Sequence, residues 1–251
     1  MKRPLAVTTL TAAVLALAAC GGSDDGSGDG TTTLRVAAAA SLTDSFEELA
    51  KTYEKQHDDV EVELQFAGSS DLASQIKGGS DVDVFASADE PNMDKVSSMV
   101  KDPTIFATNT LTIVTEPGNP EDITGMKDLA DPDLAVVVCA PEVPCGNATG
   151  RLAKKEHVTL DPASEEAKVT DVLAKVTSGE ADAGLVYVTD ATGAGDDVTT
   201  VEPKGADAVV NDYPIATLEE SASPEDAQAF VDLVTGKEGQ KVLRADGFGA
   251  P

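Results

Sequence analysis

The stretch that decides the fold is residues 33–66, TLRVAAAASLTDSFEELAKTYEKQHDDVEVELQF. Its first seven residues, 33–39, are typical of a buried strand, and residues 60–66 alternate apolar and polar side chains as a half-buried strand does. Between them, large apolar residues recur at helical spacing over 42–56. A strand, a helix and a second strand in this order indicate an α/β domain with a largely parallel sheet.

The junction between the first strand and the helix carries only small side chains. Four alanines, 37–40, lead directly into Ser41. A helix N-terminus has unpaired N–H groups and a partial positive charge, so it can hold an anion if nothing bulky stands in the way. A lone serine before a helix is explained equally well as an ordinary cap, and both roles are compatible. The pattern therefore predicts a candidate anion contact at Ser41.

The rest of the chain continues the alternation of strands and helices. The predicted helices are 70–78, opened by a serine cap, 90–100, about 125–130, about 148–156, 167–179, 223–236 and 237–247, and the predicted strands include 81–88, 133–138 and 183–188. Two longer β-rich runs, 106–117 and 207–218, divide this succession. If both runs pass between two α/β lobes, a cleft lies between the lobes, and such clefts are preferred ligand sites.

The N-terminal residues are typical of an export signal. Residues 1–19 hold two basic residues, an uncharged run and a small-residue end, as a signal peptide does. Because Cys20 follows, the run resembles a bacterial lipobox, whose cysteine is lipidated; an ordinary signal peptide with a coincidental cysteine is the alternative. Residues 20–32 continue as a flexible linker of Gly, Ser, Asp and Thr. We therefore expect an extracytoplasmic body, anchored to the cell membrane by lipidated Cys20.

The chain is strongly acidic, with a formal net charge of −27. This charge repels polyanions, so a nucleic acid partner is not expected, and it suits a secreted protein that must stay dissolved. Salt screens surface charge over about 10 Å, whereas contacts inside a closed cleft act at hydrogen-bonding distance. The net charge therefore does not decide the ligand. No segment stands out as an interface for self-association, and we expect a monomer.

Five ordered segments carry a resemblance to a known family. They are VAAAASLTDSFEELA (36–50), FAGSSDLASQI (66–76), DVDVFASAD (81–89), PEVPCGNATG (141–150) and AGLVYVTDA (183–191). Together they resemble the molybdate-binding proteins of bacterial molybdate ABC transporters, over residues 33–251. The resemblance implies a two-lobed, type II periplasmic-binding fold, in which two crossover strands join two mostly parallel, helix-flanked sheets. We expect lobe I at 33–112 and 212–251, and lobe II at 113–211.

The resemblance also implies the ligand and its contacts. The positions that match the family's ligand set are Ser41 and Ser69, which give hydroxyl groups, Cys145 and Val169, which give backbone N–H groups, and Tyr187, which gives its phenol. Cys145 departs from the small residue that is common there, but a backbone donor does not require a particular side chain. The implied ligand is molybdate or tungstate, bound as an oxyanion without any cofactor. The implied partners are an ABC permease and its ATPase.

Cys139 lies six positions before Cys145. With Cys20 lipidated in an oxidising compartment, a Cys139–Cys145 disulfide is the simplest pairing, and two free thiols are the alternative. A metal site that combines these cysteines with His157 lacks the short paired spacing of structural zinc sites.

Two other functions compete with molybdate capture. A serine hydrolase would need an imidazole base, but no G-x-S-x-G motif is present and His57 and His157 both follow charged, solvated stretches. We therefore expect no enzymatic activity. The same fold could bind sulfate, phosphate or a small organic acid. The absence of Arg and Lys from the serine motifs disfavours a carboxylate ligand, but sulfate needs the same donors in a tighter cage.

Overall fold

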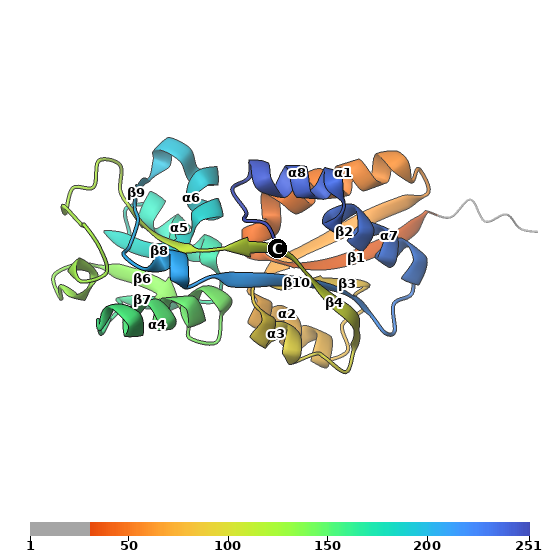
Figure 1. Ribbon diagram of the computed structural model, residues 1–251, viewed down its shortest axis with the longest axis horizontal. Coiled ribbons are helices and arrows are strands. Elements are labelled where there is room, and N and C mark those ends of the chain that lie inside the picture. The colour runs from red at the N-terminus through yellow and green to blue at the C-terminus, as the bar shows by residue number, and fades with distance from the viewer. Residues whose placement is uncertain (1–30) are drawn as a thin grey trace, which may run out of the picture. The chain divides into compact units, whose positions relative to one another are not determined.

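The computed structural model describes residues 31–251. The predicted signal peptide (1–19), the lipidated Cys20 and the linker up to residue 30 lie outside the described residues. Thr32, the last residue of the predicted linker, begins the first strand. The described residues form one compact unit built around two five-stranded sheets (Figure 1).

The first sheet has the strand order β2-β1-β3-β10-β4. Its strands are β1 (Thr32–Ala39), β2 (Val60–Ala67), β3 (Val84–Ala86), β4 (Val100–Asn109) and β10 (Asn211–Leu218). β1 pairs in parallel with β2 and β3, whereas β10 runs antiparallel to both of its neighbours, β3 and β4. Four strands therefore run in one direction, and only β10 opposes them.

The second sheet repeats this arrangement in the order β7-β6-β8-β5-β9. Its strands are β5 (Leu111–Thr115), β6 (Val136–Cys139), β7 (Ser164–Glu166), β8 (Ala183–Tyr187) and β9 (Thr199–Val201). β6 pairs in parallel with β7 and β8, and β5 runs antiparallel to β8 and β9. In this sheet only β5 opposes the other strands. Like β10 in the first sheet, β5 lies next to a point where the chain passes from one sheet to the other, because it begins two residues after β4 ends.

Helices cover both sheets. Those of the first lobe are α1 (Thr43–Gln56), α2 (Ser69–Lys77), α3 (Glu90–Asp94), α7 (Pro224–Thr235) and α8 (Lys237–Ala245), and those of the second are α4 (Pro144–Glu156), α5 (Val169–Thr177) and α6 (Val188–Ala194). Short 3-10 turns occupy η1 (Ala40–Leu42), η2 (Asp128–Ala130), η3 (Gly195–Asp197) and η4 (Ala206–Ala208). In the first lobe α1, α7 and α8 pack together on one face of the sheet, and α2 and α3 lie on the other (Figure 1).

Residue alternation along the strands explains the two covered faces. In β3, Val84 and Ala86 belong to the main apolar core, whereas Phe85 packs into a second cluster with Leu72 and Ile76 of α2. Because successive side chains of a strand point to opposite faces, a central strand covered on both sides must be apolar throughout. The strand predicted over 81–88 contains β3, and the side chains of β3 are buried on both faces of the sheet.

The periodic apolar residues of 42–56 form the buried side of α1. Leu42, Phe46, Leu49 and Tyr53 are each at most 1% exposed. Phe46 packs edge-on against Phe230 of α7, with ring centroids 5.9 Å apart. Large apolar side chains thus fix α1 along its length, from Leu42 just before its first residue to Tyr53 in its last turn, and the small residues 37–40 lie ahead of it.

Two predicted helix starts are wrong in detail. The helix expected from a serine cap at residue 70 begins at Ser69, its N-cap is Gly68, and no side chain caps it. The helix expected from about 148 begins at Pro144, which occupies the first helical position because its fixed backbone angle suits a helix start. Both corrections bring predicted ligand residues into the first turn of a helix.

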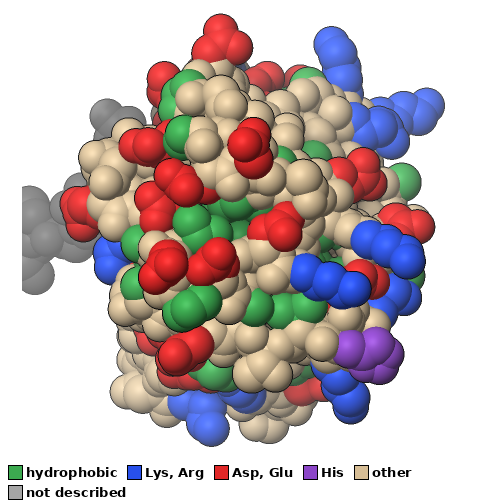
Figure 2. Space-filling model, turned by 90° about the vertical axis from the view of Figure 1, so that its left-hand side faces the viewer, with side chains coloured by type: hydrophobic (Ala, Val, Ile, Leu, Met, Phe, Trp, Pro, Cys, Tyr) green, Lys and Arg blue, Asp and Glu red, His purple; other side chains and the backbone are tan. Residues whose placement is uncertain are grey.

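Charge is unevenly distributed over the surface of the second lobe. Figure 2 shows Asp and Glu side chains across much of one face, and Lys and Arg side chains gathered toward one edge. Among residues 31–251, no helix combines the length and the apolar character that crossing a bilayer requires.

Candidate functional site

The two serines of the first lobe lie at one edge of its sheet. Ser41 follows β1 in η1, and Ser69 follows β2 as the first residue of α2. β1 and β2 are parallel and in register to their last residues, Ala39 and Ala67, so both strands end at the same level. Ser69 is buried and Ser41 is partly exposed. The parallel pairing of two strands therefore brings together two hydroxyl groups that are far apart in the sequence.

The second lobe presents three residues to the same space. Cys145 is the second residue of α4, Val169 is the first residue of α5, and Tyr187 is the last residue of β8. All five residues that the sequence singled out line one small cavity between the lobes. Its complete lining is Ala39, Ala40, Ser41, Ala67, Gly68, Ser69, Ala88, Val143, Pro144, Cys145, Val169 and Tyr187. None of these residues is charged.

Three helix N-termini point their first turns at this cavity. They belong to α2, α4 and α5, and none of their N-cap residues (Gly68, Val143 and Lys168) supplies a side-chain cap. The first N–H groups of a helix have no partner within the helix, and helices in proteins usually satisfy them with a capping side chain. Together with the partial positive charge of each terminus, these N–H groups form a site for an anion.

Each of the three hydroxyl groups at the cavity has a protein partner on its far side. Ser69 Oγ accepts a hydrogen bond of 3.0 Å from the N–H of Ala88. The phenol oxygen of Tyr187 accepts one of 2.8 Å from the amide of Asn211. Ser41 Oγ lies 3.0 Å from the phenol oxygen of Tyr213, and either oxygen can be the donor. Where the oxygen already accepts, its own proton remains available for a ligand.

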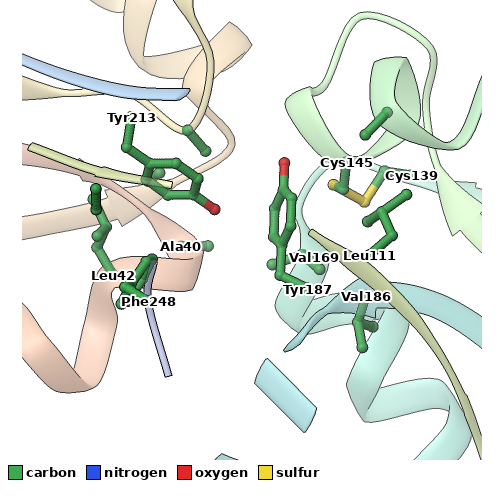
Figure 3. Close-up of a cluster of buried hydrophobic side chains, with 14 of the residues drawn as sticks. Ala40, Leu42, Leu111, Cys139, Cys145, Val169, Val186, Tyr187, Tyr213 and Phe248 are labelled. Atoms are coloured by element: carbon green, nitrogen blue, oxygen red, sulfur yellow. A yellow bond between two sulfur atoms is a disulfide. The ribbon is translucent and has the colours of Figure 1, made fainter. Parts of the chain in front are cut away.

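The two phenols face one another from opposite lobes. Tyr213 on β10 and Tyr187 on β8 direct their hydroxyl groups toward a common space (Figure 3), with ring centroids 5.9 Å apart. Burial raises the pKa of Tyr187 well above its ordinary value, and the neighbouring Tyr213 and Asp89 raise it further. Burial likewise raises the pKa of Tyr213. Both phenols therefore keep their protons at any physiological pH and act as neutral donors.

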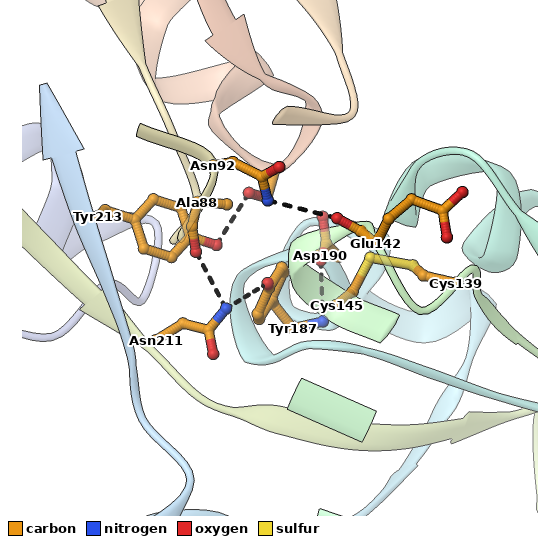
Figure 4. The surroundings of a disulfide bond; sticks show 10 residues. Ala88, Asn92, Cys139, Glu142, Cys145, Tyr187, Asp190, Asn211 and Tyr213 are labelled. Atoms are coloured by element: carbon orange, nitrogen blue, oxygen red, sulfur yellow. Dashed lines mark hydrogen bonds between the residues drawn. A yellow bond between two sulfur atoms is a disulfide. The ribbon is translucent and has the colours of Figure 1, made fainter. Parts of the chain in front are cut away.

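A disulfide fixes the start of α4. It joins Cys139, the last residue of β6, to Cys145 (Figure 4). The next residue, Gly146, has no room for a side chain, because an added Cβ would lie 1.9 Å from the carbonyl oxygen of Ala140. The close approach and the disulfide together hold the N–H groups of this helix start against the end of β6.

The two lobes come into contact beside the site. A Cβ on Gly68 of the first lobe would lie 2.2 Å from the carbonyl oxygen of Ala167 in the second. The side-chain amide of Asn92, in α3, also donates to the carbonyl oxygen of Glu142, ahead of α4, at 3.4 Å (Figure 4). Both lobes therefore line the cavity and touch one another beside it.

Several residues behind the cavity escaped the sequence reasoning. Asn211, Tyr213 and Asn109 support the hydroxyl groups, and each is buried. No local pattern marks them, because their partners lie 24 to 172 positions away along the chain. The one available signal is a polar asparagine, Asn211, within the β-rich run 207–218.

Two lobes that enclose a small ligand cavity are the architecture of a solute-binding protein. The chain belongs to the bacterial extracellular solute-binding proteins, whose family pattern matches residues 34–249. It is 44% identical to the molybdate-binding protein ModA of Mycobacterium tuberculosis over 246 residues, which is 95% of this chain and 94% of that protein. The resemblance read from the five sequence segments is thereby confirmed.

Solved structures share the two-lobed fold. The periplasmic molybdate-binding protein of Azotobacter vinelandii superposes with a TM-score of 0.74 at 20% identity, covering 87% of this chain and 99% of that one. The sulfate-binding protein SubI of Mycobacterium tuberculosis also gives a TM-score of 0.74 at 20% identity, covering 86% of both chains. The predicted fold class is confirmed, but fold alone does not separate the two ligands.

Proposed function

We propose that this protein captures molybdate, and also tungstate, between its lobes and delivers it to an ABC permease and the associated ATPase. One observation carries the proposal. Three uncapped helix N-termini and three hydroxyl groups meet at a cavity whose lining contains no charged residue. The 44% identity to a molybdate-binding protein supports the same ligand. Sequestration and release of the anion require no cofactor and no chemical step.

The donor set favours a fully deprotonated oxyanion. Ser69 and Tyr187 already accept hydrogen bonds from the protein, so toward the ligand they offer protons. Helix N–H groups can only donate. A protonated oxyanion would bring a hydrogen that finds no acceptor, and an unsatisfied buried donor costs about 1–3 kcal/mol. Molybdate, tungstate and sulfate meet this condition near neutral pH, whereas hydrogen phosphate does not.

Size then separates molybdate from sulfate. Both are tetrahedral dianions, and both satisfy the same donors. The donors come from rigid elements of two lobes that are in backbone contact at Gly68 and Ala167. A larger anion fills a cage of fixed width, whereas a smaller one leaves some of the N–H and O–H groups too far away to bond. We therefore propose that the cage excludes sulfate by loss of contacts rather than by repulsion.

We also propose that the protein works outside the cytoplasm as a monomer, tethered by lipidated Cys20 after removal of residues 1–19. The family is extracellular, and the cysteine pair of the described residues is oxidised, as expected in that compartment. Mass spectrometry of membrane-extracted protein tests the anchor: we expect the mass of a chain that begins at Cys20 with attached acyl groups. An intact or unlipidated N-terminus would contradict it.

Ligand-dependent unfolding tests the proposed ligand. An anion that binds only the folded protein raises its melting temperature in proportion to the logarithm of ligand concentration over Kd. Because the chain contains no tryptophan, calorimetric scanning suits it better than intrinsic fluorescence. We expect a rise with molybdate and tungstate and little change with equal concentrations of sulfate or phosphate. A rise in melting temperature with sulfate alone would be consistent with the fold but would contradict molybdate as the ligand.

A further inference from the structure

Asn211 occupies a distinctive place behind the cavity. It is the first residue of β10, which returns the chain to the first lobe, and it is 2% exposed. Its side-chain nitrogen donates to two groups, the phenol oxygen of Tyr187 at 2.8 Å and the carbonyl oxygen of Ala88 at 3.0 Å (Figure 4). Its side-chain oxygen accepts from the guanidinium group of Arg151.

Two of these partners fix which way the amide points. The guanidinium group of Arg151 has only donors, so it must face the amide oxygen. The carbonyl oxygen of Ala88 is only an acceptor, so it must face the amide nitrogen. Both constraints give the same orientation independently. Arg151 also donates to the carbonyl oxygen of Val210 at 3.3 Å, which holds its guanidinium group in place.

The orientation of the amide determines what Tyr187 can do. With the amide nitrogen facing it, the phenol oxygen must accept, and its single proton cannot be used toward Asn211. The ring of Tyr187 lines the cavity. The proton must therefore go to an acceptor other than Asn211, and a ligand oxygen in the cavity can serve as that acceptor.

We infer that Asn211 is a positioning residue that makes Tyr187 a hydrogen-bond donor toward the bound oxyanion, and that Arg151 holds Asn211 in the required orientation. The amide also joins the lobes, because Ala88 belongs to the first and Tyr187 to the second. The hydroxyl group of Tyr187 is therefore oriented as a donor when the two lobes are in contact. This inference rests on the proposed oxyanion-binding function and adds to it the residues that set the direction of one donor.

A double-mutant cycle tests the inference by titration calorimetry with molybdate. Asn211→Asp has nearly the same shape, but its carboxylate can only accept, so the phenol proton would turn toward it and away from the ligand. Its charge also repels the anion, and that effect persists without the phenol. Combining Asn211→Asp with Tyr187→Phe separates the loss of the phenol donor from the repulsion by the new charge. We expect the loss of affinity from Asn211→Asp to be at least about tenfold smaller in the Tyr187→Phe background than in the unmutated protein.

Two further variants complete the design. Asn109→Asp places the same charge on the opposite crossover strand, where the amide does not contact Tyr187, and its cycle with Tyr187→Phe should be close to additive. Arg151→Met removes the guanidinium group of an exposed residue; it should weaken binding a few-fold, and this loss should vanish with Tyr187→Phe.

The outcomes distinguish the two proposals. If the unmutated protein binds molybdate and the cycles of Asn211→Asp and Arg151→Met are both additive, the role of Asn211 is overturned and the proposed function stands. If the unmutated protein binds none of molybdate, tungstate, sulfate and phosphate, the function and the inference fall together.

Discussion

Asn109 and Asn211 lie opposite one another where β4 and β10, the two strands adjoining the crossings between the lobes, pair. The amide of Asn211 reaches Tyr187, and the amide of Asn109 lies 3.5 Å from the phenol oxygen of Tyr213 and 2.9 Å from Thr189 Oγ1. The two asparagines thus connect the strands about which the lobes would move with two phenols, that of Tyr187 in the cavity lining and that of Tyr213 behind it. We expect closure of the lobes and alignment of the donors to be coupled for this reason.

Removing a serine hydroxyl should weaken molybdate binding. Ser41→Ala and Ser69→Ala each remove a donor to a charged oxygen, and we expect a loss of about 1–3 kcal/mol in binding free energy. Titration calorimetry measures it directly. Ser74→Ala is the matched control, because Ser74 lies on α2 but its hydroxyl donates to the backbone of Ser70. Unchanged affinity in both serine variants would rule out the assigned contacts.

Adding one carbon atom at Gly68 should hinder closure. Its φ of −61° suits any residue, so Gly68→Ala causes no local strain. The new Cβ would meet the carbonyl oxygen of Ala167 at 2.2 Å across the lobes. We expect weaker binding with little change in unfolding temperature, and a larger radius of gyration in the presence of molybdate by small-angle scattering. Gly150→Ala serves as the control, since a Cβ there meets nothing within 4 Å.

Reduction of the Cys139–Cys145 disulfide should lower both stability and affinity. A short closed loop contributes about 2 kcal/mol to the free energy of unfolding in the chain-entropy description. Denaturant titration of the protein with and without reductant measures this difference. The double variant Cys139→Ser, Cys145→Ser should reproduce the reduced protein. Affinity should fall as well, because the disulfide holds the first turn of α4 at the cavity; affinity that is indifferent to reductant would contradict this.

Asp190 should make stability fall as the pH rises. Its pKa is raised to about 7, chiefly by burial and to a smaller extent by the neighbouring Asp44, although the hydrogen bond from the N–H of Tyr187 opposes the shift. The folded protein therefore holds a proton that the unfolded chain releases near pH 4. The free energy of unfolding then decreases between about pH 4 and pH 7, because the unfolded state binds fewer protons there.

Asp190→Asn tests this pH dependence. The amide oxygen can still accept the 2.9 Å hydrogen bond from the Tyr187 N–H, but it does not ionise. We expect the variant to gain stability relative to the unmutated protein as the pH rises from 5 to 8, measured by denaturant titration at each pH. Asp128→Asn is the matched control and should show no such trend over this range, because hydrogen bonds from Thr124 lower the pKa of Asp128 below its ordinary value and its carboxyl group is ionised in both the folded and the unfolded protein throughout. Parallel profiles for Asp190→Asn and the unmutated protein would exclude the assigned role.

The sequence predicted those parts of the molecule that local pattern controls. Helical spacing over 42–56 identified α1, although Ser41 lies in the 3-10 turn η1 ahead of this helix and the helix starts at the cavity belong to α2, α4 and α5. The positions of Ser41, Ser69 and Tyr187 at the ends of β1, β2 and β8 follow from the strand–helix alternation, although their role as ligands came only from the family resemblance.

The supporting side chains could not be predicted in the same way. Tyr213 contacts Ser41 across 172 positions, and Asn211 contacts Tyr187 only because β10 returns from the second lobe to the first. Such contacts depend on the pairing of distant strands, which no local pattern encodes. The predicted start of α4 near residue 148 is wrong because Pro144, whose fixed backbone angle suits a first helical position, already begins the helix.

The most direct test of the account is the ratio of Kd values for sulfate and molybdate, measured by titration calorimetry under identical buffer conditions. Both anions carry two charges and four acceptor oxygens, so the ratio reports the fit of the donor cage and not the net charge of the protein. We expect tight binding of molybdate and similar binding of tungstate. Sulfate should bind at least about a hundredfold more weakly, which is about 2.7 kcal/mol in binding free energy. Equal affinity for sulfate and molybdate, or preference for sulfate, would contradict it.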